Sequence, residues 1–130
     1  GQTDCIVSFE TTEALRNIAY LKEGGFLLVA DESIKPLPVA CGRASMPRNV
    51  RERLSEYGAV LIPAHDLALE AGNAKCENVA ILGAMMGAEP EDVEFDKMVE
   101  AIRLELGERK MKFLEGNKAC LEAGMAAAKA

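Results

Sequence analysis

Two short apolar runs separated by a helical pattern constrain the fold more than any other feature of the sequence. Residues 5–9 and 26–30 are apolar and partly β-branched, which is typical of strands buried on both faces. Four apolar residues recur between them at helical spacing: Ala14, Leu15, Ile18 and Leu21. A strand–helix–strand order predicts a right-handed crossover and a parallel sheet.

Local signals mark where the first helix begins and where the unit ends. Thr11 or Thr12 can cap the helix, and Glu13 is favourable in its first turn. We expect Gly24-Gly25 to end the unit as a turn before the second strand. Because this glycine pair precedes a strand rather than a helix, it does not fit a phosphate-binding loop.

Residues 31–63 predict a less regular segment, a helix and a third strand. Pro36 and Pro38 remove backbone donors, so residues 37–41 are expected as an edge strand or an extended arm. Pro47 suits the first turn of a helix that Gly58 closes. The apolar residues 59–62 then predict a strand that Pro63 stops.

The remainder of the chain has helical patterns. We expect a short helix over 66–71 closed by Gly72-Asn73, and a nearly all-apolar helix over 79–86 capped by Asn78. An amphipathic helix follows, and 108–129 predicts a last helix. The amphipathic helix has an expected apolar stripe of Phe95, Met98, Val99, Ile102 and Leu106. The last helix is expected to turn Met111, Leu114, Leu121 and Met125 inward.

These patterns predict an α/β fold: a Rossmann-like, mostly parallel sheet with flanking helices and a helical C-terminal region. We expect one domain over residues 1–130, strand-rich over 4–63 and helical over 64–130. Gly83 lies inside an apolar helix, which indicates a close backbone contact, either internal or across a subunit interface. Gly116 and Gly124 weaken the last helix, so its end is expected to fray or to dock on a partner.

Charge and composition exclude several functional classes. With 15 basic and 21 acidic residues the net charge is −6, which argues against a nucleic-acid partner. No apolar run is long enough to span a membrane, and the first four residues do not resemble a signal peptide. The four cysteines are scattered, so we expect reduced thiols in a cytoplasmic protein and no metal site.

No complete catalytic constellation is evident, and two polar residues are candidates for cofactor binding. Glu10 follows the first strand, where polar residues of open parallel sheets line a ligand crevice; the alternative is contact with nearby helix amides. Asn78 is the other candidate, with helix capping as its alternative. His65 beside Asp66 is expected to be structural rather than catalytic, because adjacent helical residues do not face each other.

Several segments in order resemble one family. They are Ser8-Phe9-Glu10, residues 13–16, residues 21–25, residues 34–39, residues 67–73 and, most specifically, Asn78-Val79-Ala80-Ile81-Leu82-Gly83-Ala84. Together they resemble the gamma-type domain of 2-oxoacid:ferredoxin oxidoreductases, within which the β subunit of indolepyruvate oxidoreductases is the nearest type. The resemblance runs from about Asp4 to Gly87, and the segment after Glu89 matches only as a helical pattern.

The resemblance implies a Rossmann-like domain that acts in oxidative decarboxylation of an aryl 2-oxoacid to an acyl-CoA, with electrons passed to ferredoxin. It implies that thiamine diphosphate and iron–sulfur clusters lie mainly on partner subunits, and that this chain docks against a catalytic oxidoreductase subunit. We therefore expect no catalytic residue and no cofactor on this chain itself.

The sequence departs from the family at two points. A Gly-x-Gly-Gly-Gln-Gly motif ahead of Asp4 is missing, so the domain is expected to be truncated at its N-terminus, with an exposed sheet edge. Pro63 stands where the family usually has Asp. Both departures weaken the expectation of direct cofactor contact. Two alternatives stay open: a stand-alone nucleotide- or CoA-binding module, and a structural homo-oligomer built through the sheet edge and the Gly83 helix.

Overall fold

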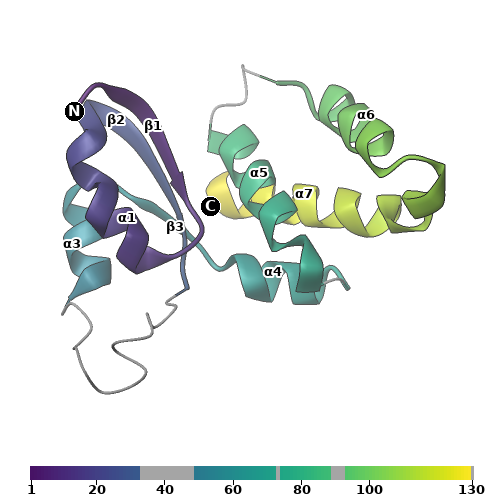
Figure 1. Cartoon of the computed structure of the whole chain (residues 1–130). Coiled ribbons are helices and arrows are strands. Elements are labelled where there is room, and N and C mark those ends of the chain that lie inside the picture. The colour runs from purple at the N-terminus through teal and green to yellow at the C-terminus, as the bar shows by residue number, and fades with distance from the viewer. Residues whose placement is uncertain (33–48, 73, 89–92, 130) are drawn as a thin grey trace. The chain divides into compact units, whose positions relative to one another are not determined.

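The computed structural model describes residues 1–32, 49–72, 74–88 and 93–129, and it divides into two compact units (Figure 1). Unit 1 is Gly1–Leu61 and unit 2 is Ile62–Ala130. The division falls close to the predicted change from strand-rich to helical sequence. That the two units make up one domain stays a prediction. The α/β fold class is confirmed.

Unit 1 is built on a three-stranded sheet. The strands are β1 (Thr3–Ser8), β2 (Leu21–Ala30) and β3 (Val60–Ile62), in the order β1-β2-β3. β1 and β2 pair in parallel, with Cys5 opposite Phe26 and Ser8 opposite Val29. The parallel pairing predicted from the strand–helix–strand order is therefore confirmed. Asp4 and Lys22 form an ion pair of 2.5 Å, which lowers the pKa of the Asp4 carboxyl through a hydrogen bond and the lysine charge.

The Gly24-Gly25 pair lies inside β2, so the prediction that it ends the unit was wrong. The register shifts between the pairs Thr3–Leu21 and Cys5–Phe26. The extra residues in this interval belong to β2, so the irregularity lies in that strand. Gly24 has a φ of +76°, a left-handed conformation that glycine adopts without steric cost. The glycines therefore form a bulge in the middle strand rather than a turn before it.

The first helix is shorter than predicted and has a different cap. α1 spans Thr11–Asn17 and continues as a 3₁₀ turn, η1 (Ile18–Tyr20), after which Leu21 begins β2. The cap is Glu10, so the predicted cap at Thr11 or Thr12 was wrong. Both threonines are instead buried in the first turn.

A second helix of unit 1, α3 (Val50–Glu56), begins after Asn49, whose φ of 56° is left-handed. Gly58, with a φ of +74°, closes the helix as predicted, and its N–H donates to the Ser55 carbonyl at 3.0 Å. Pro47 and the predicted arm at 37–41 lie outside the described residues. The core of this unit consists of Ala14, Leu27, Val29 and Leu54.

Unit 2 is helical, as predicted, with some shifted boundaries. Its elements are α4 (Ala64–Glu70), the 3₁₀ turn η2 (Ala74–Cys76), α5 (Glu77–Ala88), α6 (Phe95–Leu106), the 3₁₀ segment η3 (Glu108–Phe113) and α7 (Leu114–Lys129). The predicted helix over 108–129 is thus a 3₁₀ segment followed by an α-helix. Gly72, with a φ of +91°, closes α4, and Asn73 lies outside the described residues.

Glycines allow α5 and α7 to cross with their backbones in contact. A β-carbon at Gly83 would overlap the Leu121 carbonyl oxygen, and one at Gly124 would overlap that of Ala80. A β-carbon at Gly87 would lie 2.5 Å from the Met125 carbonyl oxygen. The close contact predicted at Gly83 is therefore confirmed, and it is internal to the chain. Gly124 fixes α7 against α5.

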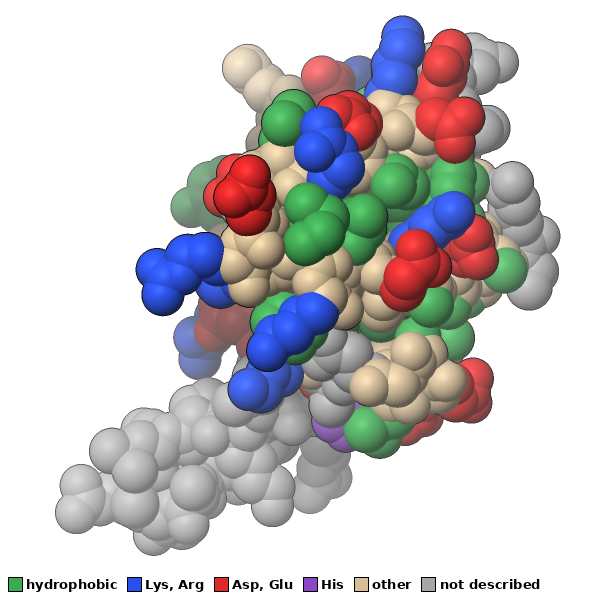
Figure 2. Space-filling model, turned by 90° about the vertical axis from the view of Figure 1, so that its right-hand side faces the viewer, with side chains coloured by type: hydrophobic (Ala, Val, Ile, Leu, Met, Phe, Trp, Pro, Cys, Tyr) green, Lys and Arg blue, Asp and Glu red, His purple; other side chains and the backbone are tan. Residues whose placement is uncertain are grey.

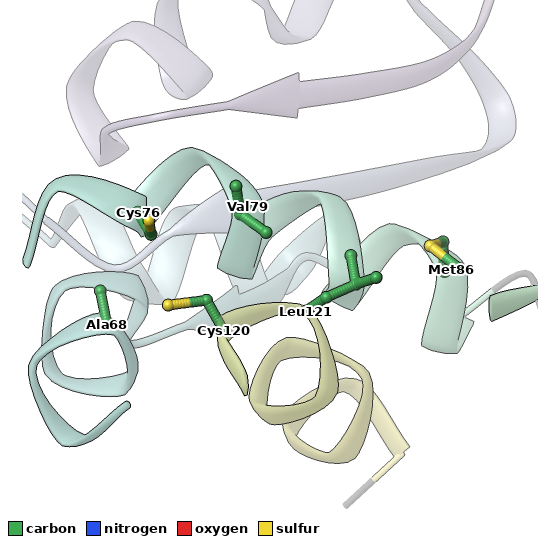
Figure 3. Close-up of a cluster of buried hydrophobic side chains, with 6 residues drawn as sticks. All are labelled: Ala68, Cys76, Val79, Met86, Cys120 and Leu121. Atoms are coloured by element: carbon green, nitrogen blue, oxygen red, sulfur yellow. The ribbon is translucent and has the colours of Figure 1, made fainter. Parts of the chain in front are cut away.

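The core of unit 2 lies where α4, α5 and α7 face one another (Figure 3). It consists of Ala68, Cys76, Val79, Met86, Cys120 and Leu121. The predicted stripe of α6 packs against this cluster through Phe95, Met98, Val99 and Ile102. Within the described ranges, no helix is both long and apolar enough to cross a membrane.

Candidate functional site

The carboxyl end of β1 holds Glu10, the first residue proposed for cofactor binding. Its Oε2 accepts a hydrogen bond from the Thr12 N–H at 2.9 Å, and its Oε1 accepts one from the Glu13 N–H at 2.6 Å. The residue is only 8% exposed. Both carboxylate oxygens therefore satisfy amides of the first turn of α1, which otherwise have no partner in the helix. The contacts correspond to the alternative raised from the sequence, that of a helix-entry residue.

Other polar groups gather at the same edge of the sheet. The Thr11 N–H donates to the Glu32 carbonyl oxygen at 2.7 Å, which joins the start of α1 to the chain after β2. Ser8 donates its hydroxyl to the Glu10 carbonyl at 2.8 Å. The Thr12 hydroxyl is buried and has no hydrogen-bond partner among the residues described. This edge is where an open parallel sheet places a ligand crevice, and its polar groups are mostly engaged with the backbone.

Asn78, the second candidate, lies in α5 rather than before it. The helix begins at Glu77, so the prediction that Asn78 is its cap was wrong. The Asn78 Oδ1 accepts a hydrogen bond from the Val79 N–H at 3.0 Å, and the side chain is exposed. It therefore satisfies an amide of the first turn from inside the helix.

His65 pairs with a carboxylate distant in the sequence. Its Nδ1 lies 2.5 Å from the Oε1 of Glu77, so the contact joins the start of α4 to the start of α5. The sequence indicated only the neighbouring Asp66 as a partner, so this pair was not predicted. When the imidazole is protonated the contact is an ion pair, and the histidine side chain is half exposed.

Two cysteines predicted as scattered thiols come together in unit 2. Cys76 and Cys120 are buried and free, whereas Cys5 is exposed and Cys41 lies outside the described residues. Burial raises the pKa of the Cys120 thiol to about 11, with smaller contributions from the charge and hydrogen bond of Cys76. Both thiols are therefore part of the apolar core of unit 2.

A group of basic residues that was not predicted as a site follows α6. Residues 105–110, 112 and 113 line an open hollow of about 690 Å³, and Arg109, Lys110 and Lys112 contribute basic side chains to it. The signal in the sequence is three basic residues within the four positions 109–112, followed by the aromatic Phe113. It is inconspicuous because charged residues are common on helix surfaces.

The chain matches one protein family over almost its whole length. The family described as pyruvate ferredoxin/flavodoxin oxidoreductase matches residues 1–127. The match therefore includes both the sheet of unit 1 and the helices of unit 2.

Curated relatives come from archaea. The chain is 34% identical to indolepyruvate oxidoreductase subunit IorB of Thermococcus kodakarensis and 33% identical to that of Pyrococcus horikoshii, in both cases over 99% of this chain. It is 28% identical to the same subunit of Archaeoglobus fulgidus over 95% of this chain. The chain spans 65% of the length of the first two relatives. No solved structure matches the chain significantly.

A family match across both units, together with relatives of the type implied by the segment Asn78–Ala84, shows that the chain belongs to the pyruvate ferredoxin/flavodoxin oxidoreductase family.

Proposed function

We propose that the chain acts as a non-catalytic part of a 2-oxoacid oxidoreductase of the indolepyruvate type. The enzyme would decarboxylate an aryl 2-oxoacid oxidatively to an acyl-CoA and pass the electrons to ferredoxin. The observation that carries this proposal is the 34% identity to an indolepyruvate oxidoreductase subunit over 99% of the chain. We place the complex in the cytoplasm.

Thiamine diphosphate and the iron–sulfur clusters belong, in this proposal, to partner subunits. The positions of the thiols support this assignment, since a cluster is usually held by four cysteines and, among the described residues, only Cys76 and Cys120 lie together. The engagement of Glu10 by two backbone amides supports it too, because that carboxylate is already satisfied within the chain. The chain's task would be to dock on the catalytic subunit and complete the complex.

Co-expression tests the proposal. The tagged chain would be produced with the thiamine-diphosphate-dependent subunit of the same organism, and the complex would be purified through the tag. We expect both chains in a constant ratio, and a rate of ferredoxin reduction with indolepyruvate and CoA at least about tenfold above that of the partner alone. Indolepyruvate is expected to exceed pyruvate as substrate.

Two controls make the result interpretable. The IorB subunit of Thermococcus kodakarensis with its own partner provides the positive control. A Gly124→Leu variant provides the negative one, because its side chain would force α7 away from the Ala80 backbone and disrupt unit 2. Absence of any complex, together with an unchanged rate of ferredoxin reduction, would refute the proposed role.

A further inference from the structure

The turn between α6 and α7 forms a hollow whose lining combines three kinds of side chain. Its volume of about 690 Å³ lies in the range typical of small-ligand pockets, roughly 300–1,000 Å³. The chemically distinctive lining residues are Glu105, Glu108, Arg109, Lys110, Lys112 and Phe113. Figure 2 faces this side of the molecule and shows blue basic side chains beside green hydrophobic ones.

The three basic residues of the hollow take no part in the ion pairs of the described residues. Within the part of the chain that the structure describes, the ion pairs use Arg16, Lys22, Arg51, His65 and Arg103, and none uses Arg109, Lys110 or Lys112. All three are exposed. In a chain of net charge −6, the lining of the hollow is slightly positive, with three basic and two acidic side chains. It favours an anionic group that the rest of the surface would repel.

Phe113 adds an aromatic face to the same hollow. Phe113 is 42% exposed, and the Lys112 Nζ lies 5.2 Å from the ring centroid. A planar heterocycle can stack on an exposed ring of this kind, as bases do on aromatic residues. The lysine beside the ring would meet a phosphate attached to the stacked ligand.

We propose that this hollow binds a ribonucleotide with two or more phosphates. Arg109, Lys110 and Lys112 would hold the phosphates by charge-assisted hydrogen bonds. Phe113 would stack against the base, and the carboxylates of Glu105 and Glu108 would accept hydrogen bonds from ribose hydroxyls, a pairing that carboxylates make in other nucleotide sites. A polyanion without a base or a ribose would contact only the basic residues, and the two carboxylates would repel it.

Calorimetric titration of the purified chain with ADP at low ionic strength tests the assignment. We expect ADP to bind, and adenosine and tripolyphosphate each to bind at least about tenfold more weakly, a difference of about 1.4 kcal/mol. 2′-DeoxyADP is expected to bind more weakly than ADP because one hydroxyl is lost. Absence of ADP binding would overturn the proposal. Equal binding of tripolyphosphate or poly-L-glutamate would also overturn it, since the hollow would then be a general anion or acidic-protein surface.

Matched variants locate the binding. Lys110→Glu and Lys97→Glu change the charge equally, and both positions are exposed, but only Lys110 lines the hollow. We expect Lys110→Glu to weaken ADP binding at least about tenfold and Lys97→Glu to leave it within about twofold. Phe113→Ala is compared with Leu104→Ala, a truncation of an exposed apolar side chain outside the lining. Equal effects within either pair would contradict a site in this hollow.

Discussion

Gly124 of α7 lies directly against Ala80 of α5, so closely that any side chain at position 124 would overlap the Ala80 carbonyl oxygen. The same β-carbon would also lie 2.9 Å from the Ala84 nitrogen. Both obstacles are backbone atoms, which cannot swing aside as the end of a flexible side chain can. Glycine, an unfavourable residue for an isolated helix, is therefore required at this crossing.

Substituting Gly124 by alanine should destabilise the protein although alanine favours a helix. Better helix propensity would add about 1 kcal/mol, while overpacking typically costs 1–3 kcal/mol and more against a rigid backbone. We expect a net loss of up to about 2 kcal/mol in urea unfolding. Glu122→Ala, at an exposed position of the same helix, should change stability by no more than about 0.5 kcal/mol. A stabilised Gly124→Ala variant would mean that the two helices are farther apart.

Removal of the Glu10 carboxylate should weaken the start of α1. We expect Glu10→Ala to lose about 0.5–2 kcal/mol of unfolding free energy, because two amides lose their acceptor. Glu10→Gln should lose less, since its amide keeps one oxygen acceptor. Glu13→Ala removes an exposed pair with Arg16 and one first-turn negative charge, and it should cost less than Glu10→Ala. Unchanged stability in Glu10→Ala, with lost activity of the assembled complex, would instead favour the cofactor-binding hypothesis.

The raised pKa of Cys120 predicts a loss of stability at high pH. The thiol has a pKa of about 11 in the folded chain against an ordinary 9.0, so the unfolded chain releases its proton first. The unfolding free energy is therefore unaffected by this thiol below pH 9. It falls by up to about 2–3 kcal/mol as the pH rises from 9 through 11, because the unfolded chain gives up the thiol proton first.

Lysines and tyrosines also titrate in this range, so the Cys120 effect is measured against Cys120→Ala. The difference in unfolding free energy between the two proteins should be constant up to about pH 9 and should then shrink. A difference that grows with pH would mean that the folded state favours the thiolate.

Asn49 should be replaceable by glycine but not by a β-branched residue. Its φ of 56° is left-handed, a conformation that asparagine and glycine tolerate and that costs other residues about 1–2 kcal/mol. We expect Asn49→Gly to stay within about 0.5 kcal/mol of the wild type and Asn49→Val to lose about 1–2 kcal/mol in the same denaturation assay. Equal stability of both variants would argue against the left-handed start of α3.

Local sequence patterns predicted helices and strands well where a pattern is typical of only one kind of structure. The apolar runs around Val7 and Leu28 form strands that pair in parallel as predicted. Only the second run is buried; β1 is exposed to half-buried, so the prediction of a buried first strand was wrong. The stripe of α6 packs on the core as its spacing indicated. Gly24-Gly25 was misread because turns and bulges use the same residue for the same reason, a left-handed φ.

The site residues were harder to predict because their partners are set by tertiary structure. Glu10 was located correctly at the end of a strand, but only the geometry shows that two amides occupy its oxygens. The pairing of His65 with Glu77 depends on how α4 and α5 pack, and periodicity within one helix contains no such information. The same holds for Cys76 and Cys120, which a helix crossing brings into one cluster.

The glycine crossing has a consequence for synthesis of the chain on the ribosome. α5 is apolar on nearly every side, and α7, which covers it, follows about 40 residues later. At roughly 5–20 residues per second, α5 would emerge several seconds before its cover. During that interval its exposed apolar surface would be a target for chaperones. Unit 2 could therefore complete its folding only after α7 has left the ribosomal tunnel.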